Sequence, residues 1–280
     1  FPDFFNLTQP AAKQWLMKSL IDNDERYVKA FKLFLDRSTQ HQSMTNFIHG
    51  TVSDILESLG DGKDKLNVIG VGSAGGEIDL EMFSQLRQKH PSITVDNQVI
   101  EPSVLVSKTA DLDYIKFTWN HMTDLEFKQR VKEEKTIKKA DFIHILQVLY
   151  YVKDPDATIS FFQSLLSQTG KLLITLVSGK TGREILWRKY KRQLATYPGQ
   201  YISMDDIKGM LDSKGISYRS YQMPSYLDIS ECFVEGNETA PVEMKEGVLE
   251  MLRHPDCSAE TDGKIIFNNS IEALVLDPLP

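Results

Sequence analysis

The stretch that decides the fold is Leu66-Asn67-Val68-Ile69-Gly70-Val71-Gly72-Ser73-Ala74-Gly75-Gly76-Glu77-Ile78-Asp79-Leu80. It opens with an apolar run that predicts a buried strand, and a cluster of four glycines follows. The apolar spacing of Ile78, Leu80, Phe83 and Leu86 then predicts a helix. Glycine tolerates positive φ and lets a ligand approach the main chain closely. The stretch therefore predicts a strand, a tight turn and a ligand-binding helix N-terminus.

Two acidic residues near this turn favour S-adenosylmethionine (SAM) as the ligand. The spacing Gly70-x-Gly72-x-x-Gly75 also fits a dinucleotide-binding turn, so an NAD-dependent oxidoreductase is one alternative, and a turn that binds nothing is another. Glu77 stands where a pyrophosphate would meet the helix dipole, and its charge would repel phosphate but suit the cationic groups of SAM. Glu101 ends a second expected strand, where it can accept both ribose hydroxyls. We therefore predict SAM.

Composition restricts the class of protein. The 280 residues are 41% hydrophobic and 10% aromatic, as in a globular protein with a sizeable core. A net charge of −7 argues against nucleic-acid binding, which needs clustered cations. No apolar run approaches the length of a membrane span, and no signal-peptide pattern is present. Because Cys232 and Cys257 have neither metal nor redox spacing, we expect a reduced, cytoplasmic setting.

Alternating strand and helix patterns from position 66 onward predict a parallel sheet. We expect strands over 66–71, 94–100, 114–119, 141–147 and 171–177. Helices are expected over 77–89, 124–134, 156–168, 182–194 and 203–213, and late strands over 216–222 and 264–276. Five parallel strands and a late pair favour an α/β class I SAM-dependent methyltransferase fold, with a seven-stranded, mostly parallel, doubly wound sheet.

The regions around this sheet suggest two domains. Residues 1–60 are expected to form a helical N-terminal cap that contributes to the substrate pocket. Its helices are expected over 11–20, 22–36 and 44–59, with a polar interruption at 38–42. Residues 61–280 form the expected SAM-binding domain, and about 180–263 form a small substrate-side region. Within it, residues 224–263 are proline-bearing and acidic, so we expect an irregular insertion or lid.

The residues suggest a reaction that needs no catalytic acid, base or metal. The six histidines have no metal-binding spacing, and the chain has no Gly-x-Ser-x-Gly elbow. SAM itself carries the reactivity of a methyl transfer, and the protein mainly aligns a lone pair with the methyl group in a dry pocket. A neutral amine or imidazole nitrogen suits a pocket of aromatic rings and neutral amides. Candidates for such a pocket are Tyr151, Trp187, Gln147 and Asn269.

From Tyr27 to Leu276 the chain resembles histamine N-methyltransferases and their relatives, which include a carnosine-methylating branch. The matching strings are Ser38-Thr39-x-His41-Gln42, Gly75-x-Glu77-Ile78-Asp79-Leu80, Glu101-Pro102-Ser103, Asp141-Phe142-Ile143-His144, Leu149-Tyr150-Tyr151-Val152-Lys153-Asp154, Asp228-Ile229-Ser230 and Phe267-Asn268-Asn269. The resemblance implies a cytosolic, monomeric, SAM-dependent enzyme that methylates a ring nitrogen of a small imidazole compound. A binding protein that kept the fold but lost turnover is the second function class.

By position, the resemblance implies two sets of site residues. The cofactor contacts fall on Gly70, Gly72, Ser73, Gly75, Gly76, Glu77, Glu101, Ser103, Thr123 and Leu146. The substrate contacts fall on Tyr27, Phe31, Gln40, Gln147, Tyr151, Arg183, Trp187 and Asn269.

The chain departs from the family pattern at two of the substrate positions. Gln40 replaces a glutamate that contacts the imidazole, and Arg183 replaces a tryptophan. Both changes make the pocket less negative. We therefore expect an imidazole dipeptide such as carnosine, which carries a carboxylate, to compete with or exceed histamine as the methyl acceptor.

Overall fold

The main sheet has the architecture that the strand and helix pattern predicts. The structure is a computed structural model that describes residues 24–102, 112–134, 138–190, 201–233 and 242–279. Seven strands form the sheet in the order β3-β2-β1-β4-β5-β10-β6. They are β1 (Lys65–Val71), β2 (Thr94–Ile100), β3 (Ile115–Asn120), β4 (Ala140–Leu146), β5 (Leu166–Val177), β6 (Tyr218–Met223) and β10 (Ile271–Leu276). β10 runs antiparallel to β5 and β6, and all other neighbouring strands are parallel, which confirms the class I methyltransferase fold.

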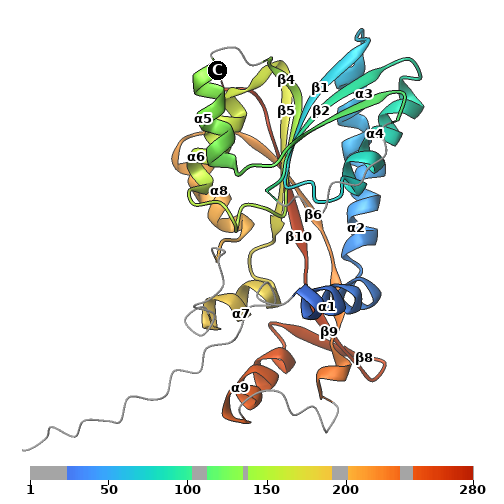
Figure 1. The fold of residues 1–280 in the computed structure, drawn as a ribbon. Coiled ribbons are helices and arrows are strands. Elements are labelled where there is room, and N and C mark those ends of the chain that lie inside the picture. Colours follow the sequence, from blue (N-terminus) through green and yellow to red (C-terminus); the bar gives the residue numbers. More distant parts are fainter. Residues whose placement is uncertain (1–23, 103–111, 135–137, 191–200, 234–241, 280) are drawn as a thin grey trace, which may run out of the picture.

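Helices cover both faces of the sheet (Figure 1). One face packs against α2 (Gln40–Phe47), α3 (Ser53–Gly60) and α4 (Glu77–Lys89), and a π-helical segment, Ile48–Val52, joins α2 to α3. The other face packs against α5 (Asp124–Glu134), α6 (Pro155–Ser164) and α8 (Met204–Ser213). Strands buried on both faces explain the continuous apolar runs in the sequence.

A smaller layer lies beyond the carboxyl ends of the parallel strands (Figure 1). It contains α1 (Asp24–Arg37), α7 (Gly182–Tyr190), α9 (Val242–Arg253) and the 3-10 turn Ser230–Phe233. A three-stranded sheet orders β7 (Tyr226–Asp228), β9 (Lys264–Asn268) and β8 (Ser258–Thr261) side by side. Phe267, Met251 and Ile229 are buried between this small sheet and the helices and give the layer its own core.

The structure corrects two expectations about the C-terminal third. The expected strand over 264–276 is two strands, β9 in the small sheet and β10 in the main sheet. It breaks because the Asn269 N–H donates to the Ser225 carbonyl at 2.9 Å, and the Ser270 N–H donates to Asn268 Oδ1 at 3.1 Å. The described parts of residues 224–263, which are 224–233 and 242–263, are also largely regular, because they contribute β7, β8 and α9.

Other differences concern the ends of elements. β5 begins at Leu166 rather than at 171, because α6 ends at Ser164 rather than at 168. The polar interruption predicted at 38–42 is limited to Ser38 and Thr39, since α2 begins at Gln40. The helix expected over 11–20 lies outside the described residues. Among the described helices, none is both long and apolar enough to cross a membrane.

Candidate cofactor and substrate site

The glycine loop lies where the strand order reverses between β1 and β4. This is the point at which open α/β sheets bind ligands. Gly72 has a φ of +71°, and its N–H donates to the Ile100 carbonyl at 2.9 Å. Gly76, with a φ of +84°, precedes α4, and its N–H closes the turn on the Ser73 carbonyl at 2.8 Å. A Cβ on Gly72 would lie 2.0 Å from Val148 Cγ2, so both backbone shape and space require glycine there.

Two carboxylates flank the loop. Glu101 follows β2, and its Oε2 accepts from the Ala74 N–H at 3.2 Å. A carboxylate has about four acceptor positions, so this contact leaves capacity for ribose hydroxyls. Glu77 is the first residue of α4 and is exposed, and its side chain lies so close to Gly75 that a Cβ there would meet Glu77 Oε1 at 2.4 Å. The loop, the helix N-terminus and Glu101 thus form a cradle that fits the amino-acid and ribose parts of SAM.

The other predicted cofactor residues differ in their burial and in their hydrogen bonds. Ser73 Oγ is buried and has no hydrogen-bond partner among the described residues, as expected of a hydroxyl that meets a ligand. Leu146 ends β4 and is half-buried. Thr123 is exposed, and its N–H and hydroxyl donate to Glu126 Oε2 at 2.7 and 2.9 Å, which lowers the pKa of Glu126. This capping box starts α5. Ser103 lies outside the described residues.

Aromatic side chains gather at the end of β4. Gln147 has a φ of +56°, a strained conformation for a residue with a side chain, and the Tyr150 hydroxyl donates to its Oε1. The ring of Tyr150 lies 5.4 Å from that of Tyr151 and 5.6 Å from that of Trp187, edge to face in both cases. The Arg183 guanidinium lies 5.5 Å from the Trp187 ring centre. Four predicted substrate residues are therefore brought together around Tyr150.

Tyr150 is the residue that sequence reasoning missed. The sequence motif contains both tyrosines, and the resemblance assigns the substrate contact to the neighbouring Tyr151, which is 51% exposed. Tyr150 is buried, and burial raises the pKa of its hydroxyl, so the phenol stays protonated and keeps its hydrogen bond to Gln147. Gln147 Nε2 is buried and has no partner within the described chain. The amide is thus fixed at one end and offers a donor at the other.

A second pair of amide side chains joins two segments that are far apart in the sequence. Asn269 Nδ2 donates to Gln40 Oε1 at 2.9 Å, and Asn269 is only 1% exposed. Gln40 begins α2, and Asn269 lies in the break between β9 and β10. The Ser178 N–H donates to the Ser270 carbonyl at 3.1 Å and holds this break against the end of β5, which leads into the helix of Trp187.

Tyr27 and Phe31 both lie on α1, four residues apart and so on the same side of the helix. The structure does not describe their side chains. The end of α1 is fixed to the small sheet, since the Thr39 N–H donates to the Tyr226 carbonyl at 2.9 Å and Arg37 forms an ion pair with Glu231. The backbone therefore brings α1 to the same side of the molecule as the amide pair.

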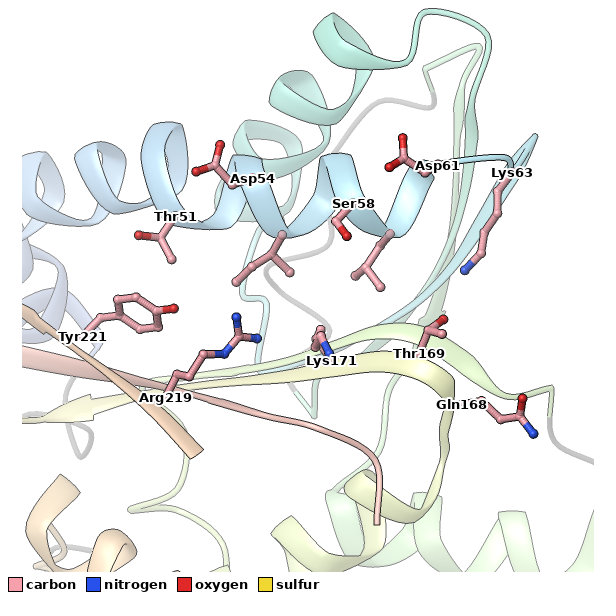
Figure 2. A pocket seen from close by; sticks show the side chains of 12 residues that line it. Thr51, Asp54, Ser58, Asp61, Lys63, Gln168, Thr169, Lys171, Arg219 and Tyr221 are labelled. Atoms are coloured by element: carbon pink, nitrogen blue, oxygen red, sulfur yellow. The ribbon is translucent and has the colours of Figure 1, made fainter. Parts of the chain in front are cut away.

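A cavity of about 820 Å³ lies elsewhere, between α3 and the strands (Figure 2). It is formed near the amino ends of β1 and β5, opposite the glycine loop, and none of the predicted site residues lines it. Its strand side carries Lys171 and Arg219, and its helix side carries Asp54 and Asp61. Mixed charges and distance from the switch point separate this cavity from the candidate site.

Comparisons with known proteins agree with this geometry. The methyltransferase-domain family matches residues 44–220. The YcgJ protein of Bacillus subtilis has a TM-score of 0.53 at 10% identity and covers 82% of this chain and 99% of its own. The plantazolicin methyltransferase BpumL, solved with a pentazolic analogue and SAH, has a TM-score of 0.52 at 11% identity, with 93% and 94% covered. Fold and loop together define a class I SAM-dependent methyltransferase.

Relatives with higher identity give the family. Histamine N-methyltransferase of Danio rerio is 50% identical over 287 residues, which cover 93% of this chain and 98% of that protein. The Bos taurus enzyme of the same name is 38% identical with the same coverage, and carnosine N-methyltransferase 2 of Gallus gallus is 40% identical over 90% of this chain and 87% of that protein. This chain belongs to the histamine N-methyltransferase family. The resemblance and the prediction of a SAM-dependent N-methyltransferase are confirmed, and an oxidoreductase is set aside.

Proposed function

We propose that the chain transfers the methyl group of SAM to a ring nitrogen of a small imidazole compound. The candidate acceptors are histamine and an imidazole dipeptide such as carnosine, whose methylation gives anserine. The names of the relatives support this proposal, since they include both histamine and carnosine N-methyltransferases. The aromatic rings grouped around the neutral amide of Gln147, which is followed by Val148 packed against Gly72, support it independently.

We assign the cofactor to the glycine loop and the acceptor to the aromatic cluster. The main chain of Gly72–Gly76 would hold the amino-acid part of SAM, and Glu101 would accept its ribose hydroxyls. Gln147 and Asn269 would orient the imidazole without adding charge, while Tyr151 and Trp187 would exclude water from it. SAM supplies an electrophilic methyl group, so the residues only need to align the acceptor with it.

The acceptor nitrogen attacks in its neutral form. Its lone pair forms the new N–CH₃ bond as the bond from the methyl carbon to sulfur breaks, and the methylated ring then loses its N–H proton to solvent. The rate should therefore rise with pH through the imidazole pKa, about 6.5, and then level off. Burial raises the pKa of Tyr150, so this residue should cause no fall in rate within the working range.

The hydrogen bond between Asn269 and Gln40 is the observation that carries our assignment of the acceptor. Gln40 Oε1 faces Asn269 Nδ2, so the Nε2 donor is the polar group at the other end of the Gln40 amide. A glutamate at this position would accept from Asn269 with one oxygen and from a cationic substrate with the other. Gln40 instead suits an acceptor such as a carboxylate, and Arg183, over the Trp187 ring, would add a positive charge to the proposed acceptor pocket.

We therefore propose that carnosine competes with or exceeds histamine. A charge-assisted hydrogen bond contributes roughly 1.5–3 kcal/mol, or about one to two orders of magnitude in affinity. Radiolabelled methyl transfer should be measured as kcat/KM for both acceptors on wild type, Gln40→Glu and Arg183→Ala. Gln40→Glu should shift preference towards histamine, and Arg183→Ala should impair only carnosine. Arg188→Ala is the matched control, since Arg188 lies on the same helix and pairs with Glu184 and Asp206.

Two results would contradict parts of this proposal. A strong preference of the wild type for histamine that Gln40→Glu leaves unchanged would make the enzyme a histamine methyltransferase with a neutral substitution at position 40. The absence of labelled product from histamine, carnosine and other imidazoles would leave a binding protein without turnover.

The proposal extends to the setting of the enzyme. We propose a cytoplasmic monomer, as the family resemblance implies, in which α1 and the small sheet form the substrate side. Cys232 and Cys257 are both unpaired, in keeping with a reducing compartment. Light scattering coupled to size-exclusion chromatography should give a mass near 31.9 kDa for this chain, and a dimer mass would contradict the monomer.

A further inference from the structure

A fully buried polar trio lies directly beneath the glycine loop. Asp79 on α4 accepts at Oδ1 from Asn97 Nδ2 on β2 at 2.7 Å and from His144 Nε2 on β4 at 3.0 Å. All three residues are 0% exposed. Apart from the loop itself, these two hydrogen bonds join the helix that follows the glycines to the strands on both sides of β1.

Gly70 makes room for this trio. In the sheet register, Gly70 of β1 pairs with His144 of β4. A Cβ on Gly70 would lie 2.8 Å from the His144 Cε1 atom and 2.4 Å from Ser73 Oγ. The φ of Gly70 is not in the left-handed region, so space rather than backbone shape demands glycine here. The missing side chain thus lets the imidazole ring reach across β1 to Asp79.

The trio costs free energy that an apolar core would not. Asp79 Oδ2, Asn97 Oδ1 and His144 Nδ1 are buried and have no hydrogen-bond partner among the described residues. Each such group loses its hydration without compensation. Apolar side chains of similar volume are often as stable as a buried ionic group or more so. Buried polar groups that lower stability in this way concentrate at functional sites, where the position of a side chain matters more than stability.

We propose that Asp79, held by His144 and Asn97, is a positioning residue for methyl transfer. Asp79 is the third residue of α4, so it fixes the first turn and the glycine loop before it. His144 lies three residues before Gln147, so the same hydrogen bond fixes the turn that orients the acceptor. The trio therefore sets the position of the cofactor relative to the end of β4. It touches neither SAM nor the acceptor.

Asp79→Asn tests this inference, with Glu272→Gln as the matched control. Asn keeps the shape of Asp79 but removes the negative charge that strengthens both hydrogen bonds to Oδ1, and it places an N–H₂ group at the buried Oδ2 position, which has no partner among the described residues. Glu272 is also a carboxylate with 0% exposure, but it lies on β10 and bonds Ser178 and Lys208. Calorimetric titration with SAH should show the Kd rising about tenfold, which corresponds to about 1.4 kcal/mol, for Asp79→Asn and staying unchanged for Glu272→Gln. The KM for the imidazole acceptor should change less than about twofold in Asp79→Asn, while kcat falls.

The outcomes separate positioning from plain stabilisation. Both variants should lower the melting temperature, so an equal loss of SAH affinity at equal loss of stability would overturn the inference. So would an unchanged Kd in Asp79→Asn. If that variant does not fold, Asn97→Ala keeps the Asp79–His144 bond and should raise the Kd by about threefold, about 0.65 kcal/mol, and an unchanged Kd there overturns the inference as well. The inference rests on the proposed cofactor site, and failure of the wild type to bind SAH would contradict that site instead.

Discussion

The cofactor side and the substrate side of this molecule are built from very different spans of chain. The glycine loop and Glu101 belong to one strand–helix–strand unit, and the bond from Ala74 to Glu101 joins residues 27 positions apart. On the substrate side, Asn269 and Gln40 are 229 positions apart. The first is a largely local arrangement of β1, α4 and β2, to which β4 adds the bond between His144 and Asp79. The second exists only after the main sheet and the small sheet have both formed.

The two sides also differ in what they use for binding. The cofactor side relies on backbone shape at Gly72 and Gly76, with one carboxylate, so few substitutions are compatible with it. The substrate side relies on side chains held by other side chains, such as Gln147 held by Tyr150. A side chain can be exchanged without altering the fold. This difference explains how one cofactor site can serve relatives with different acceptors.

The largest effect should come from Gly72→Ala. The new Cβ would lie 2.0 Å from Val148 Cγ2, and the φ of +71° strains any side chain. Overpacking costs about 1–3 kcal/mol, and left-handed backbone costs about 1–2 kcal/mol. SAH binding measured by calorimetry should fall by at least about a hundredfold. Gly62→Ala is the control, because Gly62 has a φ of +70° but open space around it. If Gly62→Ala weakened SAH binding equally, strain rather than the local clash would be responsible.

Glu101→Ala should have the next largest effect. It removes two proposed hydrogen bonds between a charged group and the ribose, each contributing about 1.5–3 kcal/mol. The SAH affinity should fall by about a hundredfold, which corresponds to the lower values for the two bonds, with the melting temperature nearly unchanged because Glu101 is not buried. Titration of the wild type with NADH checks the class of cofactor, because binding of NADH but not of SAH would contradict SAM as the cofactor. An unaltered SAH affinity in Glu101→Ala would remove Glu101 from the site.

The contrast between the two sides also explains what the sequence could predict. The parallel strands, their helices and the glycine loop follow from local periodicity and from glycine spacing, and β2, α4 and α5 have the expected bounds. The break at Asn269 has a local signal, since the polar run Asn268-Asn269-Ser270 separates two apolar runs, but the bond to Ser225 that fixes the break depends on the folded chain. Tyr150 and Tyr151 are equally aromatic in the sequence, and only packing decides that Tyr150 holds Gln147. His144 in an apolar strand was the one signal of the buried trio.

A smaller effect is expected from Tyr150→Phe on the substrate side. The change deletes the hydroxyl that donates to Gln147 Oε1 but keeps the ring contacts with Tyr151 and Trp187. A neutral hydrogen bond contributes about 0.5–1.5 kcal/mol, so kcat/KM for the acceptor should fall by about two- to tenfold. The SAH affinity should not change. Tyr221→Phe removes a tyrosine hydroxyl next to the cavity near α3 and serves as the control. Equal losses of kcat/KM in both variants would show that the hydrogen bond between Tyr150 and Gln147 does not contribute to the reaction.

The smallest effect concerns acid stability of the small sheet. The hydroxyl and N–H of Ser230 donate to Asp228 Oδ1 at 2.6 and 3.1 Å, and with Lys264 they lower the pKa of Asp228 from 3.8 to about 2. A carboxyl with a depressed pKa in the folded state contributes stability that is fully present above pH 3.8 and is lost as the pH falls towards 2. Thermal unfolding of wild type and Asp228→Asn should therefore differ by a constant amount near neutral pH, and the difference should shrink below about pH 4.

Because Asp228 lies on β7, an edge strand of the small sheet, and is only half-buried, this contribution is modest and weakens with salt. The cofactor side offers an internal check, since no bond joins Asp228 to the glycine loop among the bonds described for it. SAH affinity should be the same in wild type and Asp228→Asn at neutral pH. A stability difference that stays constant down to pH 2.5 would show that the Ser230 bonds do not depend on the charge of Asp228. A change in SAH affinity would show that the two sides are coupled through the fold, against the independence that their separate spans of chain imply.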